Sequence, residues 1–192
     1  MNLTLRQVWV ALRLLVVMTL VLGVVYPVVM FGVGRIVAGS ADGSYVTDTK
    51  GQVVGSALIG QTFEGDTWFL PRPSAAGDGY DALSSGGSNL AADNPDLVKA
   101  VAERKAAAAK ADGVAPGAVP PDALTASGSG LDPDISPEYA REQVARVAKA
   151  RNLDPARVAA LVEDHVQGRV LGFIGEPRVN VLTLNLALAQ LR

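Results

Sequence analysis

Two short clusters rich in glycine and serine are the first candidates for chemistry in this chain. One spans residues 84–89 and the other spans residues 127–130. Exposed backbone N–H groups in such stretches can cradle an anion such as a phosphate group. The alternative is that both clusters are tight turns that join packed elements, because short Gly-Ser strings are common in proteins. We favour the turns and keep anion binding as the second hypothesis.

A nucleophilic mechanism would have to use Ser129 with His165, which is the sole histidine. The Gly-x-Ser-x-Gly pattern of a nucleophile elbow is absent, because Ser127 stands two positions before Ser129. His165 is expected near the end of a helix, where an exposed histidine suits the negative end of the helix dipole. There is also no Gly-Lys pair, so a Walker phosphate loop is excluded. An anchored surface hydrolase is therefore only a minor alternative.

The acidic run Asp132, Asp134 and Glu138 has the spacing of the start of a calcium-binding loop. The sixth position of that loop requires glycine, and here it is Pro137. We expect these acids to cap a helix that begins at Pro137. The sequence predicts no metal site.

A long apolar segment near the N-terminus precedes all of these candidate residues. Residues 14–33 are twenty consecutive residues without a charge, and thirteen of them are Leu, Val or Phe. A helix of this length covers about 30 Å, which is the thickness of the hydrocarbon layer of a membrane. We therefore predict a transmembrane anchor over residues 1–37, a linker over 38–50 and one soluble domain over 51–192. A cleaved signal peptide, cut near residues 38–41, is the alternative.

The charges around the anchor predict its orientation. Arg6 and Arg13 flank its N-terminal end, whereas Arg35 is soon followed by Asp42 and Asp48. Because positively charged flanks stay on the cytoplasmic side, the N-terminus is expected in the cytoplasm and the soluble domain outside the cytoplasmic membrane.

Three residues inside the anchor could shape its contacts with other helices. Pro27 removes one backbone donor and, with Gly23 one turn earlier, is expected to kink the helix. Gly23 and Gly32 would allow another membrane helix to approach closely. The alternative is that membrane helices tolerate glycine and proline generally.

Composition limits the partners of the soluble domain. Residues 36–192 carry 14 basic and 19 acidic side chains, a net charge of −5. Nucleic acid binding needs clustered positive charge, so it is excluded. The chain has no cysteine, which excludes disulfides and thiolate metal sites.

The soluble domain is predicted to be α+β, a single mixed α/β domain. Strands are expected in 52–63, 67–70 and 123–126, where short apolar runs lie between Gly, Asp and Pro. Helices are expected over 95–110, 137–152 and 155–168, since cap residues followed by proline begin each of them. The apolar residues in 180–191 fit both the helical period of 3.6 residues and the strand period of two. Asn180, as a cap residue, favours a helix.

Taken in order, several strings resemble the C subunit family of Kdp-type potassium-transporting ATPases across essentially the full chain. The strings are Leu58-Ile-Gly-Gln61-x-Phe63, Arg72-Pro-Ser-Ala-Ala-Gly77, Tyr80-Asp81, Ser85-Gly-Gly-Ser-Asn-Leu90, Asn94-Pro95, Leu124-Thr-Ala-Ser-Gly-Ser-Gly-Leu-Asp-Pro133, Ile135-Ser-Pro137 and Gly175-Glu-Pro-Arg-Val-Asn-Val-Leu182 with Leu184-Asn-Leu-Ala-Leu188. One departure is Asp134, where the family usually has histidine, so a required catalytic or metal-binding role at that position is doubtful here.

The resemblance implies an accessory, non-catalytic subunit of a potassium uptake complex. Its expected partners are a pore-like A subunit that binds potassium, a P-type B subunit that hydrolyses ATP, and a small F subunit. The family is described as aiding assembly and as raising the ATP affinity of the B subunit. By that description ATP contacts would fall on Ser85, Gly86, Gly87 and Ser88, with Gln61 as a further candidate. Contacts with membrane or partner are expected at Gly23, Pro27, Gly32 and Arg72.

The topology and the family description disagree. ATP is cytoplasmic, while the charges place the soluble domain outside, and a domain cannot reach a nucleotide across about 30 Å of hydrocarbon. We therefore expect no firmly bound cofactor and favour a structural subunit that works through its helix and its outer domain. A nucleotide-binding regulatory subunit is the alternative.

Overall fold

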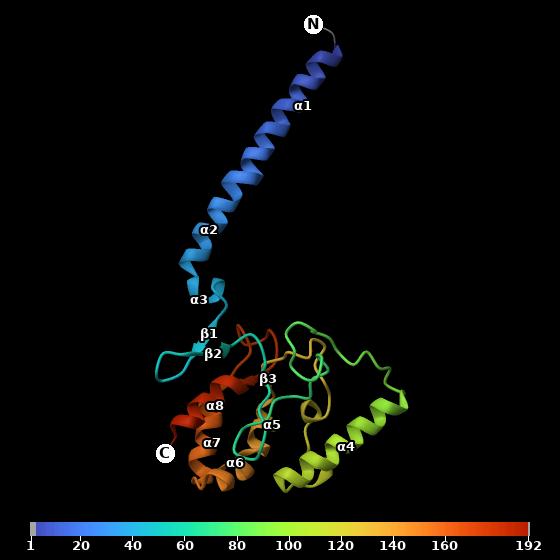
Figure 1. Cartoon of the computed structure of the whole chain (residues 1–192), viewed down its shortest axis with the longest axis vertical. Coiled ribbons are helices and arrows are strands. Elements are labelled where there is room, and N and C mark those ends of the chain that lie inside the picture. Colours follow the sequence, from blue (N-terminus) through green and yellow to red (C-terminus); the bar gives the residue numbers. More distant parts are fainter. Residues whose placement is uncertain (1–2, 192) are drawn as a thin grey trace. The chain divides into compact units, whose positions relative to one another are not determined.

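The computed structural model describes residues 3–191, which form two compact units (Figure 1). The first unit is Met1–Ser44 and the second is Tyr45–Arg192. The division falls inside the predicted linker, residues 38–50. That stretch contains a helical turn, α3 (Ala38–Ala41), and the first strand of the second unit, β1 (Tyr45–Thr47).

The first unit is one helical path with a local irregularity. It consists of α1 (Leu3–Leu20), a π-helical turn (Val21–Val25) and α2 (Tyr26–Ile36). The N–H of Tyr26 bonds to the carbonyl of Val21, five residues back. The next residue is Pro27, which has no N–H to continue the regular ladder, so one wider turn precedes it. The structure thus has a π turn at this point, and the predicted kink at Gly23 and Pro27 stays a prediction.

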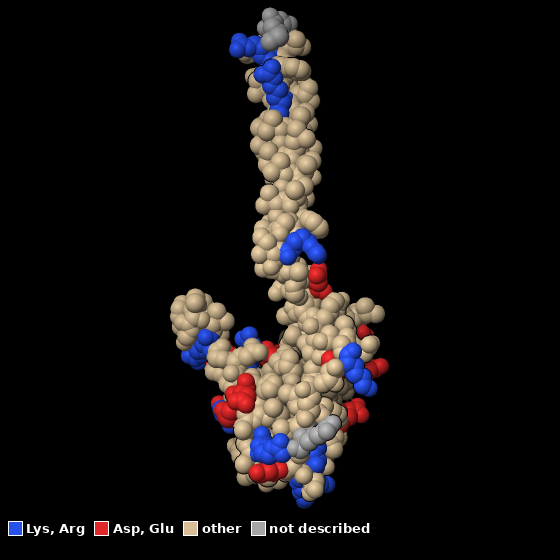
Figure 2. Space-filling view, turned by 90° about the vertical axis from the view of Figure 1, so that its left-hand side faces the viewer, with Lys and Arg blue, Asp and Glu red and all other residues tan. Residues whose placement is uncertain are grey.

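This helix is long and apolar enough to cross a membrane. It runs over 34 residues, Leu3–Ile36, and none of its side chains is buried. At 1.5 Å per residue its length is about 50 Å. Figure 2 shows the middle of the helix free of Lys, Arg, Asp and Glu, with basic groups towards its two ends. The predicted N-terminal apolar helix is confirmed by length and composition.

The second unit contains two small antiparallel sheets. β1 pairs with β2 (Val53–Ser56) as a hairpin. A three-stranded sheet has the order β3 (Asp134–Ile135), β5 (Arg178–Asn180), β4 (Val166–Gln167). Strands of two or three residues bury little by themselves, so the helices supply most of the packing.

The helices of the second unit begin where their caps predict. They are α4 (Pro95–Asp112), α5 (Pro137–Glu142), α6 (Val144–Arg151), α7 (Pro155–Asp164) and α8 (Val181–Gln190), with 3₁₀ turns at Pro116–Ala118 and Pro121–Ala123. Asn94, Asp154 and Asn180 each accept a backbone N–H of the first turn through the side chain. The mixed helix and strand class is confirmed, and 181–190 is a helix.

Several sequence predictions were wrong in extent or type. The strand expected over 52–63 is limited to Val53–Ser56, and residues 67–70 are a turn followed by irregular backbone instead of a strand. Residues 123–126 are not a strand, because a 3₁₀ turn ends at Ala123. The helix expected over 137–152 is divided at Gln143, and α7 ends at Asp164 instead of 168. None of β3, β4 and β5 was predicted.

The core of the second unit lies between α5, α6, α7 and α8. Val158 and Val162 of α7 and Leu184 and Leu188 of α8 are completely buried. They share one cluster with Phe69, which lies in the irregular segment before residue 72. Packing of these apolar faces thereby fixes the loops that reach the polar cavity described below.

Candidate functional site

The segment of residues 65–72, which begins with a turn and continues as irregular backbone, reaches the candidate site, and side chains from the helices hold it in place. The N–H and carbonyl of Phe69 bond to Asn185 at 2.9 Å each. The N–H and carbonyl of Leu70 bond to Gln143 at 2.6 and 3.1 Å. Two amide side chains thus take the place of a neighbouring strand, because an amide offers one donor and one acceptor side by side.

Arg146 completes this attachment from α6. Its guanidinium lies 2.7 Å from Asp112 and donates to the carbonyls of Asp66 and Trp68, each at 3.0 Å. Both members of the Arg146–Asp112 pair are almost fully buried. A buried charge pair is tolerated only when its remaining hydrogen-bonding groups are satisfied, and the loop carbonyls do this for Arg146.

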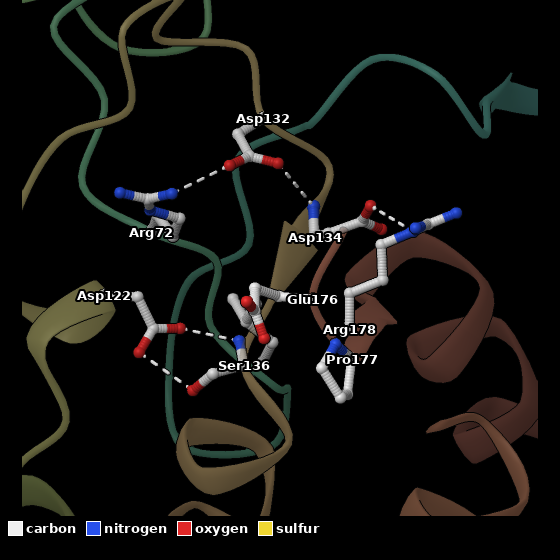
Figure 3. A pocket seen from close by; sticks show the side chains of 9 residues that line it. Arg72, Asp122, Asp132, Asp134, Ser136, Glu176, Pro177 and Arg178 are labelled. Atoms are coloured by element: carbon white, nitrogen blue, oxygen red, sulfur yellow. Dashed lines mark hydrogen bonds and ion pairs between the residues drawn. The ribbon is translucent and has the colours of Figure 1, made fainter. Parts of the chain in front are cut away.

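The segment ends at a polar cavity of about 330 Å³, which is the best candidate site (Figure 3). Its walls combine four carboxylates and two guanidiniums from distant parts of the chain. The lining residues are Arg72, Asp122, Asp132, Asp134, Ile135, Ser136, Glu176, Pro177 and Arg178.

The charges around the cavity are paired with one another. Arg72 lies 2.9 Å from Asp132, and Arg178 lies 3.0 Å from Asp134. Asp132 also accepts the backbone N–H of Asp134 at 3.1 Å. Asp122 accepts both the N–H and the hydroxyl of Ser136, at 2.7 and 2.9 Å. Figure 3 shows these bonds bridging strand β3 to its surrounding loops.

Burial perturbs two groups at or beside the cavity. It raises the pKa of Asp134, an effect opposed by the hydrogen bond from Asn180 and by the charge of Arg178. Burial, helped by the negative charge of Asp132, raises the pKa of Tyr80 to about 12. The hydroxyl of Tyr80 donates to the carbonyl of Arg72 at 2.7 Å. Tyr80 is therefore a neutral group that positions Arg72.

We predicted that Asp132, Asp134 and Glu138 cap the helix that begins at Pro137, which is α5. This prediction was wrong. Ser136 is the cap, since its hydroxyl oxygen accepts the N–H of Tyr139 at 3.0 Å. Asp132 and Asp134 bind arginines instead. The prediction failed because Arg72 and Arg178, which attract these carboxylates, are far away in the sequence. Within residues 3–191, no three acidic or histidine side chains group as metal ligands would.

The two glycine-serine clusters lie against each other. The carbonyl of Ser129 accepts the N–H of Gly86 at 2.8 Å and the hydroxyl of Ser85 at 3.0 Å. Gly130 has φ +68°, and a Cβ there would lie 2.7 Å from the backbone N of Ala76 and the carbonyl O of Gly86. These bonds fasten the long loop before α4 onto residues 127–130. The N–H of Gly130 bonds to the carbonyl of Ser127 at 3.3 Å, so the second cluster forms a turn, whereas residues 85–89 are irregular backbone and not the tight turn that was predicted. Anion binding by either cluster stays a prediction.

The other predicted nucleotide contact, Gln61, lies elsewhere. Its amide donates to the carbonyl of Val54 at 3.0 Å. It borders a mostly apolar cavity of about 190 Å³ with Phe63, Trp68 and residues of α8. None of the residues that line this cavity comes from 84–89 or 127–130, so the structure does not join Gln61 to Ser85, Gly86, Gly87 and Ser88 there.

The two residues of the hydrolase hypothesis, Ser129 and His165, each form a hydrogen bond with the nearby backbone. Nδ1 of His165 lies 2.8 Å from the carbonyl of Leu161, one turn earlier. The hydroxyl of Ser129 accepts the N–H of Leu131 at 3.1 Å. These bonds give His165 and Ser129 local structural roles at a helix end and a turn.

Of the predicted partner contacts, Arg72 lies in the polar cavity, whereas Gly23, Pro27 and Gly32 lie in the apolar helix. A Cβ at Gly23 or Gly32 would meet nothing within 4 Å. Their role in helix packing stays a prediction. Sequence reasoning missed Asp122 and Arg178 as cavity residues, although Arg178 was part of a string that carried the family resemblance.

Comparison with known proteins matches the same regions. Residues 8–190 match the family described as KdpC, K+-transporting ATPase, c chain. The Potassium-transporting ATPase KdpC subunit of Kineococcus radiotolerans is 64% identical over 184 residues, covering 96% of this chain and 93% of that protein. The KdpC subunit of Mycobacterium tuberculosis is 51% identical over 187 residues (97% and 99%), and that of Rhodospirillum rubrum is 50% identical over 186 residues (97% and 96%).

Proposed function

Because this chain belongs to the KdpC family, the c chain of the K+-transporting ATPase, we propose that it is a membrane-anchored, non-catalytic accessory subunit of that pump. The observation that carries the proposal is that the family match covers both the apolar helix and the domain, residues 8–190. The match thus includes most of the apolar helix together with the domain, which supports a retained anchor over a removed signal segment.

We place the second unit outside the cytoplasmic membrane. The support is the distribution of charge: Arg6 and Arg13 precede the uncharged stretch, and all acidic residues follow position 41. Positive flanks are retained in the cytoplasm. In this orientation the domain stands on the side from which potassium enters the cell.

The partners follow from the family and from this topology. The helix would pack against the membrane helices of the pore-like A subunit, with the P-type B subunit and the small F subunit in the same complex. The domain would pack on the outer surface of the A subunit and stabilise the assembly. In the second unit the two glycine-serine clusters, residues 84–89 and 127–130, bond to each other. This contact suits the structural role better than a nucleotide site.

The absence of cysteine in the chain makes the topology directly testable. We expect Asp48→Cys to react with a membrane-impermeant maleimide in intact cells, and Asn2→Cys to react only after the membrane is opened. Deleting residues 1–35 should abolish co-purification with the pump. Labelling in the reverse pattern, or full co-purification without the helix, would refute the proposal.

The nucleotide-binding alternative has its own test. A Cβ at Gly86 would meet nothing within 4 Å, so Gly86→Val is expected to leave the fold intact. Saturable ATP binding by the full chain that is lost in Gly86→Val would favour a regulatory subunit that binds ATP. We expect no such binding, and an unchanged KM for ATP when this variant replaces the natural chain in the pump.

A further inference from the structure

The connection between β4 and β5 carries an unusual concentration of exposed apolar side chains. Val170, Leu171, Phe173 and Ile174 are 54, 79, 73 and 50% exposed. Single exposed apolar residues are normal on protein surfaces, but four within five positions are a contiguous apolar surface that calls for a partner. We call residues 169–176 the apolar tip.

The tip is a closed loop. The N–H of Val170 bonds to the carbonyl of Ile174 at 2.9 Å, and the reverse bond is 3.0 Å. Gly172 donates to the carbonyl of Arg169 at 3.1 Å. At its base, Arg169 and Glu176 form an ion pair at 2.5 Å. Backbone groups that bond within the loop can enter an apolar environment without losing hydrogen bonds, which is the main requirement for lipid contact.

The backbone of the tip makes a tight turn at Leu171 and Gly172, which have φ +54° and +81°. Two successive positive φ angles are the pattern of a type I′ turn, a common connection between paired strands. The N–H of Phe173 closes the turn on the carbonyl of Val170 at 3.3 Å. The turn leaves the Leu171 side chain 79% exposed.

The tip lies near the point where the chain enters the second unit. It connects β4 to β5, and Asn180 at the far end of β5 donates to the carbonyl of Ala57, directly after β2, at 3.0 Å. Two or three strand residues span only about 10 Å. Figure 1 shows the segment between α7 and α8 reaching the same side of this unit as β1 and β2.

The length of the connecting chain limits how far β1 can lie from the membrane. Only residues 37–44 separate Ile36, the last residue of the apolar helix, from Tyr45 in β1. A fully extended chain covers at most about 3.6 Å per residue, so β1 lies within about 30 Å of the end of the helix. A surface next to β1 is therefore within reach of the bilayer in which that helix is embedded.

From these observations we propose that the apolar tip inserts into the outer interface of the lipid bilayer as a second, shallow anchor for the domain. Leu171 and Phe173 enter to a depth of about 5–10 Å, where apolar side chains at the boundary of headgroups and acyl chains are found. Two attachments restrict rotation of the domain about its single helix. The inference rests on the proposed function, because it requires the helix to span the membrane.

The experiment uses the full chain in nanodiscs of phosphatidylcholine. A single cysteine is introduced as Leu171→Cys and labelled with an environment-sensitive fluorophore, and spin-labelled lipids serve as quenchers. The control is Ala145→Cys, an exposed position of α6, and Figure 1 shows this helix at the end of the second unit opposite β1 and β2. A probe at Val24→Cys, inside the apolar helix, reports separately on spanning.

We expect a blue-shifted emission for the Leu171 probe and quenching by shallow spin labels at least twofold above the Ala145 probe. The effect should persist from 50 to 500 mM salt, since insertion is apolar. Equal quenching of the two probes, or loss of the difference at high salt, would overturn the tip proposal while quenching at Val24 leaves the anchor intact. Failure at Val24 would overturn the anchor and the tip together.

The same probe in the assembled pump tests whether the apolar tip binds a partner subunit instead of lipid. If the Leu171 emission is blue-shifted there but lipid quenchers do not reach it, the tip occupies a pocket of a partner subunit, and the lipid proposal is wrong. Quenching by lipid in both preparations supports it.

Discussion

Asn185 and Phe69 hold each other through two reciprocal hydrogen bonds, although 116 residues separate them. Asn185 lies in α8, and Phe69 lies in a segment of irregular backbone with its side chain completely buried. The pair fixes the path of the loop towards Arg72, because Arg72 follows only three residues later. One amide side chain thus couples the core to the polar cavity.

Removal of that amide is expected to be costly. Asn185→Ala leaves the N–H and the carbonyl of Phe69 buried without their partner, and each such group costs about 1–3 kcal/mol. We expect a loss of about 3 kcal/mol in the free energy of unfolding, measured by chemical denaturation of the full chain in detergent. Gln190→Ala, at an exposed position of the same helix, is the control and should change little. Equal effects of the two variants would contradict the coupling.

Two ion pairs, Arg141–Glu163 and Arg146–Asp112, should differ sharply in their contribution to the free energy of unfolding. Arg146 and Asp112 are only 4 and 3% exposed. Arg146→Met leaves the buried carboxylate of Asp112 and the loop carbonyls of Asp66 and Trp68 without their partner, which should destabilise the chain by about 4 kcal/mol. The pair of Arg141 with Glu163 is exposed, so Arg141→Ala should leave the unfolding midpoint nearly unchanged. Equal midpoints for the two variants would refute the distinction.

Local signals explain which elements the sequence predicted. Asn94, Asp154 and Asn180 are caps whose partners lie two or three residues away, so a short window of sequence contains the whole interaction. Their helices were predicted for that reason. The apolar helix was predictable in the same way, since twenty uncharged residues suffice to identify it.

The remaining elements depend on distant residues. Residues 67–70 have strand-like composition, but their hydrogen-bonding partners are the side chains of Asn185 and Gln143, which no local pattern indicates. β4 and β5 are too short to show a period of two. The polar cavity joins Arg72, Asp122 and Arg178, so its existence depends on the tertiary fold. Most of its lining residues belong to the strings that carry the family resemblance, but no local pattern shows that these strings meet.

Close packing at one glycine gives a further prediction. A Cβ at Gly60 would lie 2.5 Å from the backbone oxygen of Asp132 and 2.5 Å from a ring carbon of Tyr80. The N–H of Gly60 bonds to the carbonyl of Leu131 at 2.8 Å. This bond holds the backbone at Gly60 against the segment that contains Asp132, so the two segments cannot separate freely. We expect Gly60→Ala to cost about 2 kcal/mol through overpacking.

The control for that variant is Gly86→Ala. Its Cβ would meet nothing within 4 Å, and Gly86 does not have a positive φ. Its midpoint in the same denaturation experiment should stay within the range of surface substitutions, about 0.5 kcal/mol. A Gly60→Ala variant as stable as Gly86→Ala would show that the contact with Asp132 and Tyr80 yields without cost.

Glu142 should make the stability of the domain depend on pH. Burial, followed by the negative charge of Asp112 and a hydrogen bond shared with it, raises the pKa of Glu142 to about 7 from its ordinary 4.5. Oε1 of Glu142 is buried without a hydrogen-bonding partner. Between these two pKa values the folded chain binds more protons than the unfolded chain, so this contribution to stability is complete below pH 4.5 and is lost as the pH rises to about 7.

Glu142→Gln isolates that contribution, because the neutral amide keeps the shape of the protonated acid. The variant should match the natural chain near pH 4.5 and should be the more stable of the two at pH 8. Asp134 also has a raised pKa and adds a slope of the same sign, so the quantity to measure is the difference between the two chains at each pH. Denaturation midpoints collected from pH 4.5 to 8 provide it. A difference that stays constant over this range would mean that Glu142 titrates alike in the folded and unfolded chains, and that the carboxyl of Asp112 does not act on it.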